Sequence, residues 1–141
     1  MPVSVKLSPY FTNLSHLAVN LSDAGASSIV LFNRFYNPDI NIEKMEVTAA
    51  EVHSTPGDYL NSLRWISVLS GSIHADLCAS TGIHSGETVI KQILAGASAV
   101  QVGTANFLDP AACVRVAAEL EAFCADQGVT AVSELVGGLA A

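Results

Sequence analysis

The chain has 141 residues, of which 50% are hydrophobic and only 13% are charged, and its formal net charge is −7. This composition excludes a disordered tail, because such segments are rich in charge and poor in apolar residues. The length suits one domain, and the low share of charged residues predicts that the chain buries surface in an oligomer or against a partner.

Charge and hydropathy also exclude several functional classes. The six basic residues are scattered along the chain, whereas a nucleic-acid-binding protein needs a basic stripe. No stretch approaches the roughly 18 apolar residues of a membrane span, and the first residues do not form a signal peptide. We therefore expect a cytoplasmic protein that binds neither nucleic acid nor membrane. The cysteines and histidines show no spacing typical of metal ligands, so we expect reduced core thiols and no metal site.

The first part of the chain has the pattern strand, helix, strand. Residues 2–9 (PVSVKLSP) alternate and end in a proline, and apolar residues then recur at helical spacing from Asn13 to Leu21, followed by Gly25. Residues 27–33 (SSIVLFN) form the continuous apolar run of a strand that is buried on both faces. Because helical crossovers join parallel strands, this order predicts an α/β fold.

Residues 34–64 interrupt this order. They contain Pro38, Pro56, Gly57 and the alternating stretch IEKMEV. A long excursion after the carboxyl end of a strand is often functional. We interpret it as a small antiparallel insertion, followed by a helix that begins at Tyr59.

The strand and helix pattern then returns. Residues 74–81 and 98–105 are strand candidates on either side of a helical pattern at 86–94, and Asp109–Pro110 is the expected start of another helix. The tetrapeptide Ala-Gly-Ala-Ser occurs at 24–27 and again at 95–98, each time between a helix and a strand. The repeat indicates a succession of β/α units.

Polar or small residues end the predicted strands, and ligands of parallel α/β folds bind at the carboxyl ends of strands. Two pairs, Thr81–Gly82 and Gly103–Thr104, are candidates for a phosphate cradle. Glycine lets backbone N–H groups approach a phosphate closely, and a threonine hydroxyl adds a donor. The alternative is that each glycine is only a turn residue.

For each of four further side chains, the sequence allows a functional role and a purely structural one. Lys6 lies between apolar neighbours and faces either solvent or a cleft. Asn33 either hydrogen-bonds a planar polar ligand or forms a turn. His84 follows the first glycine pair and is either a ligand contact or a surface residue. Cys78, inside a predicted strand, is a core thiol rather than a nucleophile.

The stretches VSVKLSP, LFNRFY, PDI and STGIHSGETVIKQILAGASAVQVGTANF together resemble the C-terminal half of the dihydroorotate dehydrogenase family. These are FMN-dependent TIM barrels of pyrimidine synthesis, and the class 1-like branch is the most similar. The resemblance runs from Pro2 to about Leu135. It implies a half TIM barrel of parallel βα units over residues 1–141, with a small antiparallel insertion at about 34–64. It also implies a flavin oxidoreductase that oxidises dihydroorotate or a related dihydropyrimidine.

The resemblance assigns cofactor-binding residues. Lys6 matches the strand lysine that contacts the flavin pyrimidine ring, where a cation stabilises the reduced flavin. Gly82, Gly103 and Thr104 match the cradle of the FMN phosphate. Thr81 stands in place of the first glycine of the usual pair.

For the substrate, Asn33 matches the asparagine that hydrogen-bonds the orotate ring. Arg34 replaces the small hydroxyl residue that usually follows this asparagine, and an arginine in that place is suited to bind a carboxylate.

No residue of this chain matches the catalytic base of the family, which lies before the lysine strand and is therefore expected upstream of Met1. Four predicted strands are half of the eight that a barrel requires. We expect a half barrel that associates with itself or with a missing N-terminal half. Two alternatives stay open: an inactive half-barrel fragment or association module, and a phosphate-binding half for another phosphorylated ligand.

Overall fold

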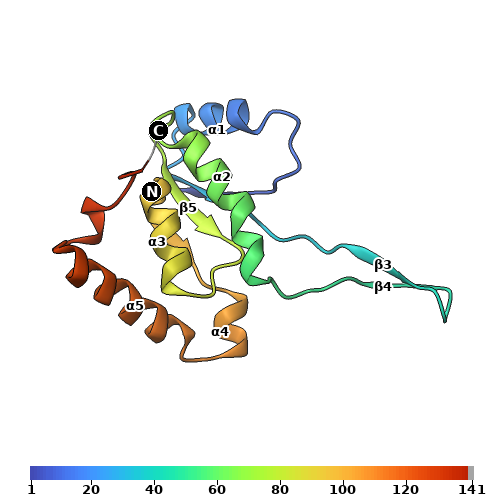
Figure 1. Ribbon diagram of the computed structural model, residues 1–141. Coiled ribbons are helices and arrows are strands. Elements are labelled where there is room, and N and C mark those ends of the chain that lie inside the picture. The colour runs from blue at the N-terminus through green and yellow to red at the C-terminus, as the bar shows by residue number, and fades with distance from the viewer. Residues whose placement is uncertain (140–141) are drawn as a thin grey trace.

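The structure is a computed structural model that describes residues 1–139. Its main sheet has four parallel strands in the order β1-β2-β5-β6 (Figure 1), namely β1 (Ser4–Leu7), β2 (Ser28–Leu31), β5 (Asp76–Ser80) and β6 (Ala99–Gln101). They are joined by α1 (Leu14–Asp23), α2 (Tyr59–Leu69) and α3 (Gly86–Ala95). The predicted α/β fold with a parallel sheet is confirmed.

The three connecting helices cover one face of this sheet. Apolar side chains alternate along the strands toward that face, including Val5 and Leu7 in β1 and Ile29 and Leu31 in β2. They pack against buried residues of the helices, such as Leu14 of α1 and Ile66 and Leu69 of α2. The hydrophobic core therefore lies on one side of the sheet, as the periodicity of two in strands and 3.6 in helices requires.

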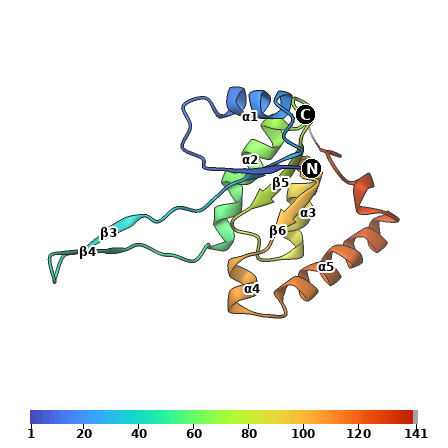
Figure 2. The ribbon, with the colours of Figure 1, turned by 180° about the vertical axis from the view of Figure 1, so that it is seen from behind.

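No helix within residues 1–139 covers the opposite face of the sheet, and Figure 2 shows β5 and β6 from this side. The side chains that alternate toward it are mostly polar. Those of the outer strands, such as Lys6 and Gln101, are exposed, whereas Val30, Cys78 and Ser80 of the two central strands are buried. A parallel sheet is normally covered on both faces. This uncovered face is thus the one that the interior of a closed barrel would bury.

The two Ala-Gly-Ala-Ser tetrapeptides have the same conformation. Gly25 and Gly96 have φ values of +97° and +119°, and the N–H of the following alanine bonds back to a helix carbonyl at 3.0 and 2.9 Å. Only glycine adopts such a φ at little cost, and the bonding pattern is that of a Schellman cap. The repeat is therefore one helix-to-strand junction used twice.

The middle segment contains a hairpin, β3 (Pro38–Asn41) with β4 (Glu46–Ala49), which projects from the body in Figures 1 and 2. The antiparallel insertion is confirmed, but its turn falls inside the IEKMEV stretch. The Asn41 side chain accepts the Lys44 N–H at 3.0 Å, and Met45 has a φ of +52°. This local turn interrupts the alternation on which the strand prediction relied. A 3-10 turn, η1 (Pro56–Asp58), then leads into α2.

The last strand is shorter than predicted. β6 ends at Gln101, and a short helix, α4 (Thr104–Leu108), occupies part of the segment predicted as strand 98–105. The next helix, α5 (Ala112–Gln127), begins later than Asp109, whose carboxylate accepts the Ala111 N–H at 3.0 Å. The apolar residues after Gly103 resemble a strand in composition, but a five-residue helix is too short for periodicity to reveal.

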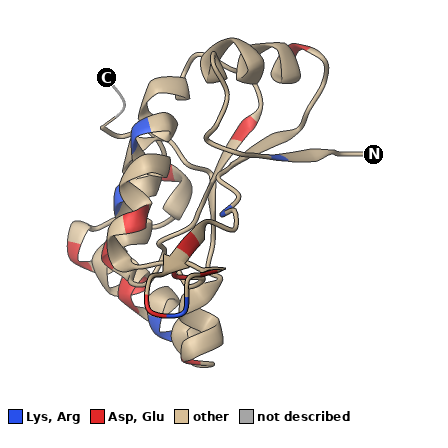
Figure 3. Cartoon of the chain, turned by 90° about the vertical axis from the view of Figure 1, so that its right-hand side faces the viewer, with Lys and Arg blue, Asp and Glu red and all other residues tan. Residues whose placement is uncertain are grey.

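A second, smaller core joins α3 to α5. Ile83, Val89, Ile93 and Val116 are buried there, and a final turn, η2 (Val132–Glu134), follows α5. Figure 3 shows the positions of Lys and Arg dispersed along the chain. No helix among residues 1–139 is both long enough and apolar enough to cross a membrane.

The edges of the sheet predict self-association. Strands β1 and β6 are unpaired on their outer sides within the described residues, and the polar face is uncovered. Open edges readily pair with another chain. We expect dimers or larger assemblies by light scattering at micromolar concentration. A stable monomer that binds no hydrophobic dye would contradict this expectation.

Candidate functional site

The carboxyl ends of the four parallel strands meet at one edge of the sheet. Leu7 is paired with Leu31 and Leu31 with Ala79, while Ser80 is paired with Gln101. The residues that follow each strand therefore lie next to one another. This register brings the predicted site residues to the same end of the molecule.

Lys6 points onto the uncovered face of the sheet and reaches across it. Its Nζ donates hydrogen bonds to Ser80 Oγ at 3.1 Å and to Gln101 Oε1 at 2.9 Å. Both partners are neutral, and within residues 1–139 Lys6 forms no ion pair. The ammonium group is thus held in place while its positive charge is not neutralised by a neighbouring carboxylate.

Cys78 lies on the same face and is buried, with 9% of its surface exposed. Burial raises the pKa of its thiol, and the positive charge of Lys6 opposes this effect only in part. Because the thiolate is the nucleophilic form, a raised pKa makes this cysteine unreactive. The prediction of core thiols holds for Cys78 but is wrong for Cys113, which is exposed on α5, and Cys124 on the same helix is only partly buried.

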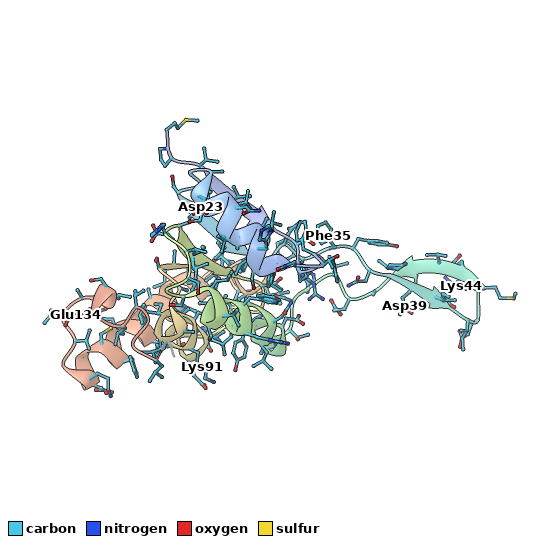
Figure 4. The ribbon with its side chains drawn as sticks, turned by 90° about the horizontal axis from the view of Figure 1, so that it is seen from above. Asp23, Phe35, Asp39, Lys44, Lys91 and Glu134 are labelled. Atoms are coloured by element: carbon cyan, nitrogen blue, oxygen red, sulfur yellow. The ribbon has the colours of Figure 1, made fainter. Side chains whose placement is uncertain are left out.

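A cavity of about 230 Å³ opens where β2 and β5 end. The aromatic side chains at its rim include Tyr10 and Phe35, whose ring centroids are 6.2 Å apart. Figure 4 shows Phe35 at the base of the hairpin, which extends away toward Asp39 and Lys44. The lining residues are Pro9, Tyr10, Phe32, Asn33, Arg34, Phe35, Asn37, Asp58, Asn61, Ser62, Ser80 and Thr81.

Asn33 and Arg34 both line this cavity, but they are bound differently. The Asn33 N–H donates to Leu7 O at 2.7 Å and extends the pairing of β1 with β2, and its side chain is exposed. The Arg34 guanidinium is bound on two sides, by Asp58 Oδ2 at 2.7 Å and by the Glu51 carbonyl at 3.0 Å. A carboxylate of this chain itself therefore holds the arginine that sequence reasoning assigned to a substrate carboxylate.

Sequence reasoning missed Asp58. The same carboxylate also accepts the Thr55 N–H at 2.7 Å, so it ties the return of the hairpin to the end of β2. A signal was present in the sequence: threonine followed three residues later by aspartate, with Pro56 between them, is the pattern of a capping box. That pattern marks the start of the helical segment but not the pairing with Arg34.

The two predicted phosphate loops are adjacent, and their glycines differ. Gly82 has a φ of +77°, and a Cβ there would lie 2.2 Å from the Tyr59 backbone nitrogen, so packing against α2 requires glycine. A Cβ on Gly103 would meet no atom within 4 Å. Gly82 therefore has a structural reason to be glycine, whereas the space above Gly103 is open to a ligand.

The threonines of these loops are hydrogen-bonded to distant segments. Thr81 has a φ of +78°, which is rare for a β-branched residue, and its Oγ1 donates to the Phe32 carbonyl at 3.0 Å. Thr104 Oγ1 accepts the Ser54 N–H at 3.2 Å, and Ser54 Oγ lies 3.1 Å from His84 Nε2. Sequence reasoning missed Ser54, because nothing in its local pattern distinguishes it from a loop serine.

The predicted residues thus fall into two groups. Asn33, Arg34 and Thr81 share the cavity, while the other four, which do not line it, lie on the uncovered sheet face or in the loops beside it: Lys6, Gly82, Gly103 and Thr104. Ser80 links the two groups, because it lines the cavity and its hydroxyl accepts a hydrogen bond from Lys6 on the uncovered sheet face.

The N-terminus of α3 is capped by the protein itself. Ser85 Oγ accepts the Thr88 N–H, and the Glu119 carboxylate of α5 accepts the Gly86 N–H. This bond from Gly86, with a further contribution from Arg115, lowers the pKa of the Glu119 carboxyl below its ordinary value of 4.5. Two N–H groups in the first turn of α3, those of Gly86 and Thr88, therefore already have acceptors within the protein.

This cap gives a pH-dependent prediction. A lowered pKa in the folded state contributes stability above the ordinary pKa, and that contribution is lost as the pH falls from 4.5 toward the lowered value. We expect Glu119→Gln to lower the thermal midpoint at neutral pH, and the difference from the unaltered chain to shrink in acid. Thermal melts followed by circular dichroism at neutral pH and in acid, below pH 4.5, test this expectation. Glu121→Gln on the same helix is the control. A difference independent of pH would contradict it.

Comparison with known proteins bears on this site. The sequence model of the family described as dihydroorotate dehydrogenase matches residues 1–124. The catalytic subunit of dihydroorotate dehydrogenase B (NAD(+)) from Geobacter metallireducens is 39% identical over 141 residues, which are 98% of this chain and 46% of that protein. The corresponding protein of a Geobacillus species is 34% identical over 97% of this chain and 45% of its own length.

Solved structures show the same fold. The ligand-free DHODH of Eimeria tenella superposes with a TM-score of 0.74 at 24% identity, over 96% of this chain and 39% of that one. The complex of that enzyme with ferulenol gives a TM-score of 0.75 at 23% identity, over 97% of this chain and 38% of that one. This chain spans less than half the length of the relatives it matches. Because the family match covers residues 1–124, the chain belongs to the dihydroorotate dehydrogenase family.

Proposed function

We propose that this chain supplies the FMN-phosphate site and part of the substrate site of a dihydroorotate dehydrogenase-type oxidoreductase of pyrimidine synthesis. In this proposal residues 1–141 form the C-terminal half of a (β/α)8 barrel, with an insertion at about 34–64. The observation that carries it is Lys6, a cation held on the uncovered sheet face beside the two glycine loops. An anionic ligand bound on this face would pair with the Lys6 ammonium group and offset the cost of excluding water from it.

The donors around this face suit a flavin phosphate. Within the described residues, the backbone N–H groups of Gly82, Ile83, Gly103 and Thr104 donate to no protein acceptor. The Thr104 hydroxyl oxygen accepts from Ser54, so its own proton is free to be donated. Two adjacent loops thus offer donors and open space above Gly103, which is the donor set a phosphate requires.

The division of labour follows from these contacts. When bound, FMN supplies the redox chemistry by accepting a hydride from the dihydropyrimidine ring. Lys6 is placed to stabilise negative charge on the reduced ring, and the two loops hold the phosphate. The exposed amide of Asn33 is available to hydrogen-bond a planar ring in the cavity.

Arg34 has a positioning role in this proposal. Its bonds to Asp58 and Glu51 fix the hairpin base and the start of α2 around the cavity. Part of the guanidinium still lines the cavity, with 28% of the side chain exposed. In this proposal the substrate is dihydroorotate or a related dihydropyrimidine, and the Arg34 that lines its cavity is already paired with Asp58.

The proposal places the catalytic base and the remaining substrate contacts on a polypeptide segment other than residues 1–141. The relatives are named as catalytic subunits of an NAD(+)-type enzyme, which favours association with a further subunit for reoxidation. A second candidate function is an inactive half-barrel module that only associates with itself or another chain. The uncovered face and open edges favour that alternative.

Flavin binding tests the proposed cofactor site. We expect FMN to bind more tightly than riboflavin, because each charge-assisted hydrogen bond to the phosphate contributes about 1.5–3 kcal/mol. Quenching of flavin fluorescence on titration with the chain measures both affinities. Equal affinity would remove the phosphate assignment, and binding of neither flavin would favour the association module.

The variant Gly103→Ala sharpens this test. A Cβ there meets no described protein atom within 4 Å, and the Gly103 φ of −111° and ψ of −87° lie just outside the α region, so we expect the variant to fold with a modest loss of stability. The methyl group instead fills the space that the phosphate needs. We expect weaker FMN binding with unchanged riboflavin binding, and a weakening of both would indicate a general structural effect.

A further inference from the structure

Ser54 connects two loops that are distant in sequence. It lies between the hairpin and η1, and 8% of its surface is exposed. Its backbone N–H donates to Thr104 Oγ1 at 3.2 Å, and its Oγ is hydrogen-bonded to His84 Nε2 at 3.1 Å. One buried serine therefore contacts the loop after β5 and the loop after β6 at once.

The two bonds act on different properties of the loops. The N–H of Ser54 occupies one lone pair of the Thr104 hydroxyl, and the hydroxyl keeps its proton to donate to another acceptor. The bond to His84 fixes the spacing between the loops, and it is compatible with either tautomer because a serine hydroxyl both donates and accepts. Because both bonds belong to one residue, loss of the bond to His84 is expected to loosen the Ser54 backbone that donates to Thr104.

The far side of His84 is also held. Its carbonyl lies 3.4 and 3.5 Å from the two terminal nitrogens of Arg115, which come from α5. His84, in the β5–α3 loop, is thus hydrogen-bonded to Arg115 through its carbonyl and to Ser54 through its ring. In contrast, the described residues provide no protein acceptor for the N–H groups of Gly82, Ile83 and Gly103 in the same loops. Contacts of His84 and Thr104 with other segments thus hold the two loops in place, while these backbone N–H groups stay available to a ligand.

We propose that Ser54 is a positioning residue that holds the two loops at the spacing needed for a phosphate group. This inference rests on the proposed function, because it concerns the same cradle. It adds that the hairpin segment, and not only the two strand ends, determines how well the phosphate is recognised.

The test compares Ser54→Ala with the unaltered chain by titration with FMN and riboflavin. Loss of one hydrogen bond predicts FMN affinity reduced about twofold to tenfold, with riboflavin affinity unchanged. Ser54→Thr retains a hydroxyl and is expected to preserve the preference for FMN. Ser67→Ala is the matched control, since Ser67 is exposed on α2 and its hydroxyl bonds only within the helix.

The outcomes separate this inference from the proposed function. If the unaltered chain prefers FMN and Ser54→Ala retains that preference, Ser54 is not a positioning residue, while the cradle stands. If the unaltered chain shows no preference, the cradle itself is wrong.

A measurement without flavin then decides the role of Ser54. In NMR spectra of the flavin-free chain, Ser54→Ala is expected to shift the amide signals of both Ile83 and Thr104. Signals that change only next to residue 54 would overturn the inference. Circular dichroism confirms that the variant is folded, which we expect because the half-exposed His84 ring can bond water instead.

Discussion

The isolated chain, supplied with FMN, is expected to oxidise dihydroorotate slower than a full-length relative by at least about 10²–10⁴-fold. A positioned base contributes that much to proton abstraction, and orientation of the substrate contributes more. Lys6 does not replace the base, because the role proposed for it, stabilising reduced flavin, requires that it stay protonated. The buried Cys78 thiol, with its raised pKa, does not replace it either. Stopped-flow reduction of the flavin by dihydroorotate measures the rate.

The positive arm of this experiment adds the part of a longer relative that this chain does not cover. Co-expression with the segments of the Geobacter metallireducens relative that this chain does not cover is expected to recover flavin reduction. In that complex Lys6→Ala should slow reduction, whereas Cys78→Ser should alter stability alone. Rapid turnover by the isolated chain would refute the half-site proposal. A folded but inactive Cys78→Ser complex would show that the base had been assigned to the wrong part of the protein.

Much of the fold followed from the sequence because buried strands and amphipathic helices have different periods. The run at 27–33 and the helical pattern at 86–94 correspond to β2 and α3. The short helix α4 and the turn at Ile42–Met45 were missed, since both depend on a few local hydrogen bonds within apolar or alternating stretches. Elements of four or five residues carry too little periodicity to be identified.

The positions of the site residues were predictable from the sequence, but their hydrogen-bond and ion-pair partners were not. Lys6 was selected because it is charged within an apolar strand, yet its contacts with Ser80 and Gln101 depend on the order of four strands. Likewise, the pairing of Arg34 with Asp58 depends on where the hairpin returns. Such contacts arise from tertiary structure, so strand-end positions reveal the residues but not their partners.

Of the glycines in the two predicted phosphate loops, Gly82 is expected to lose the most stability on substitution by alanine, because a Cβ at Gly103 has open space. A left-handed φ costs a residue with a Cβ about 1–2 kcal/mol, and overpacking adds about 1–3 kcal/mol. Both apply at Gly82, whose Cβ would lie 2.2 Å from the nitrogen of Tyr59 and 2.8 Å from the carbonyl carbon of Asp58. These are backbone atoms, and Gln92 Nε2 holds the Tyr59 carbonyl at 3.2 Å, so α2 cannot retreat freely.

Gly25→Ala is the matched control, because Gly25 has a φ of +97° and open space around its Cβ position. It should lose only the conformational part of the free energy of unfolding, so the difference between the two variants in urea denaturation measures the contact of the β5–α3 loop with α2. A displaced α2 would also move Asp58 away from Arg34, and the cavity would lose its shape along with the stability. Equal destabilisation by the two substitutions would mean that Gly82 is required for its backbone conformation alone, and that the loop does not rest on α2.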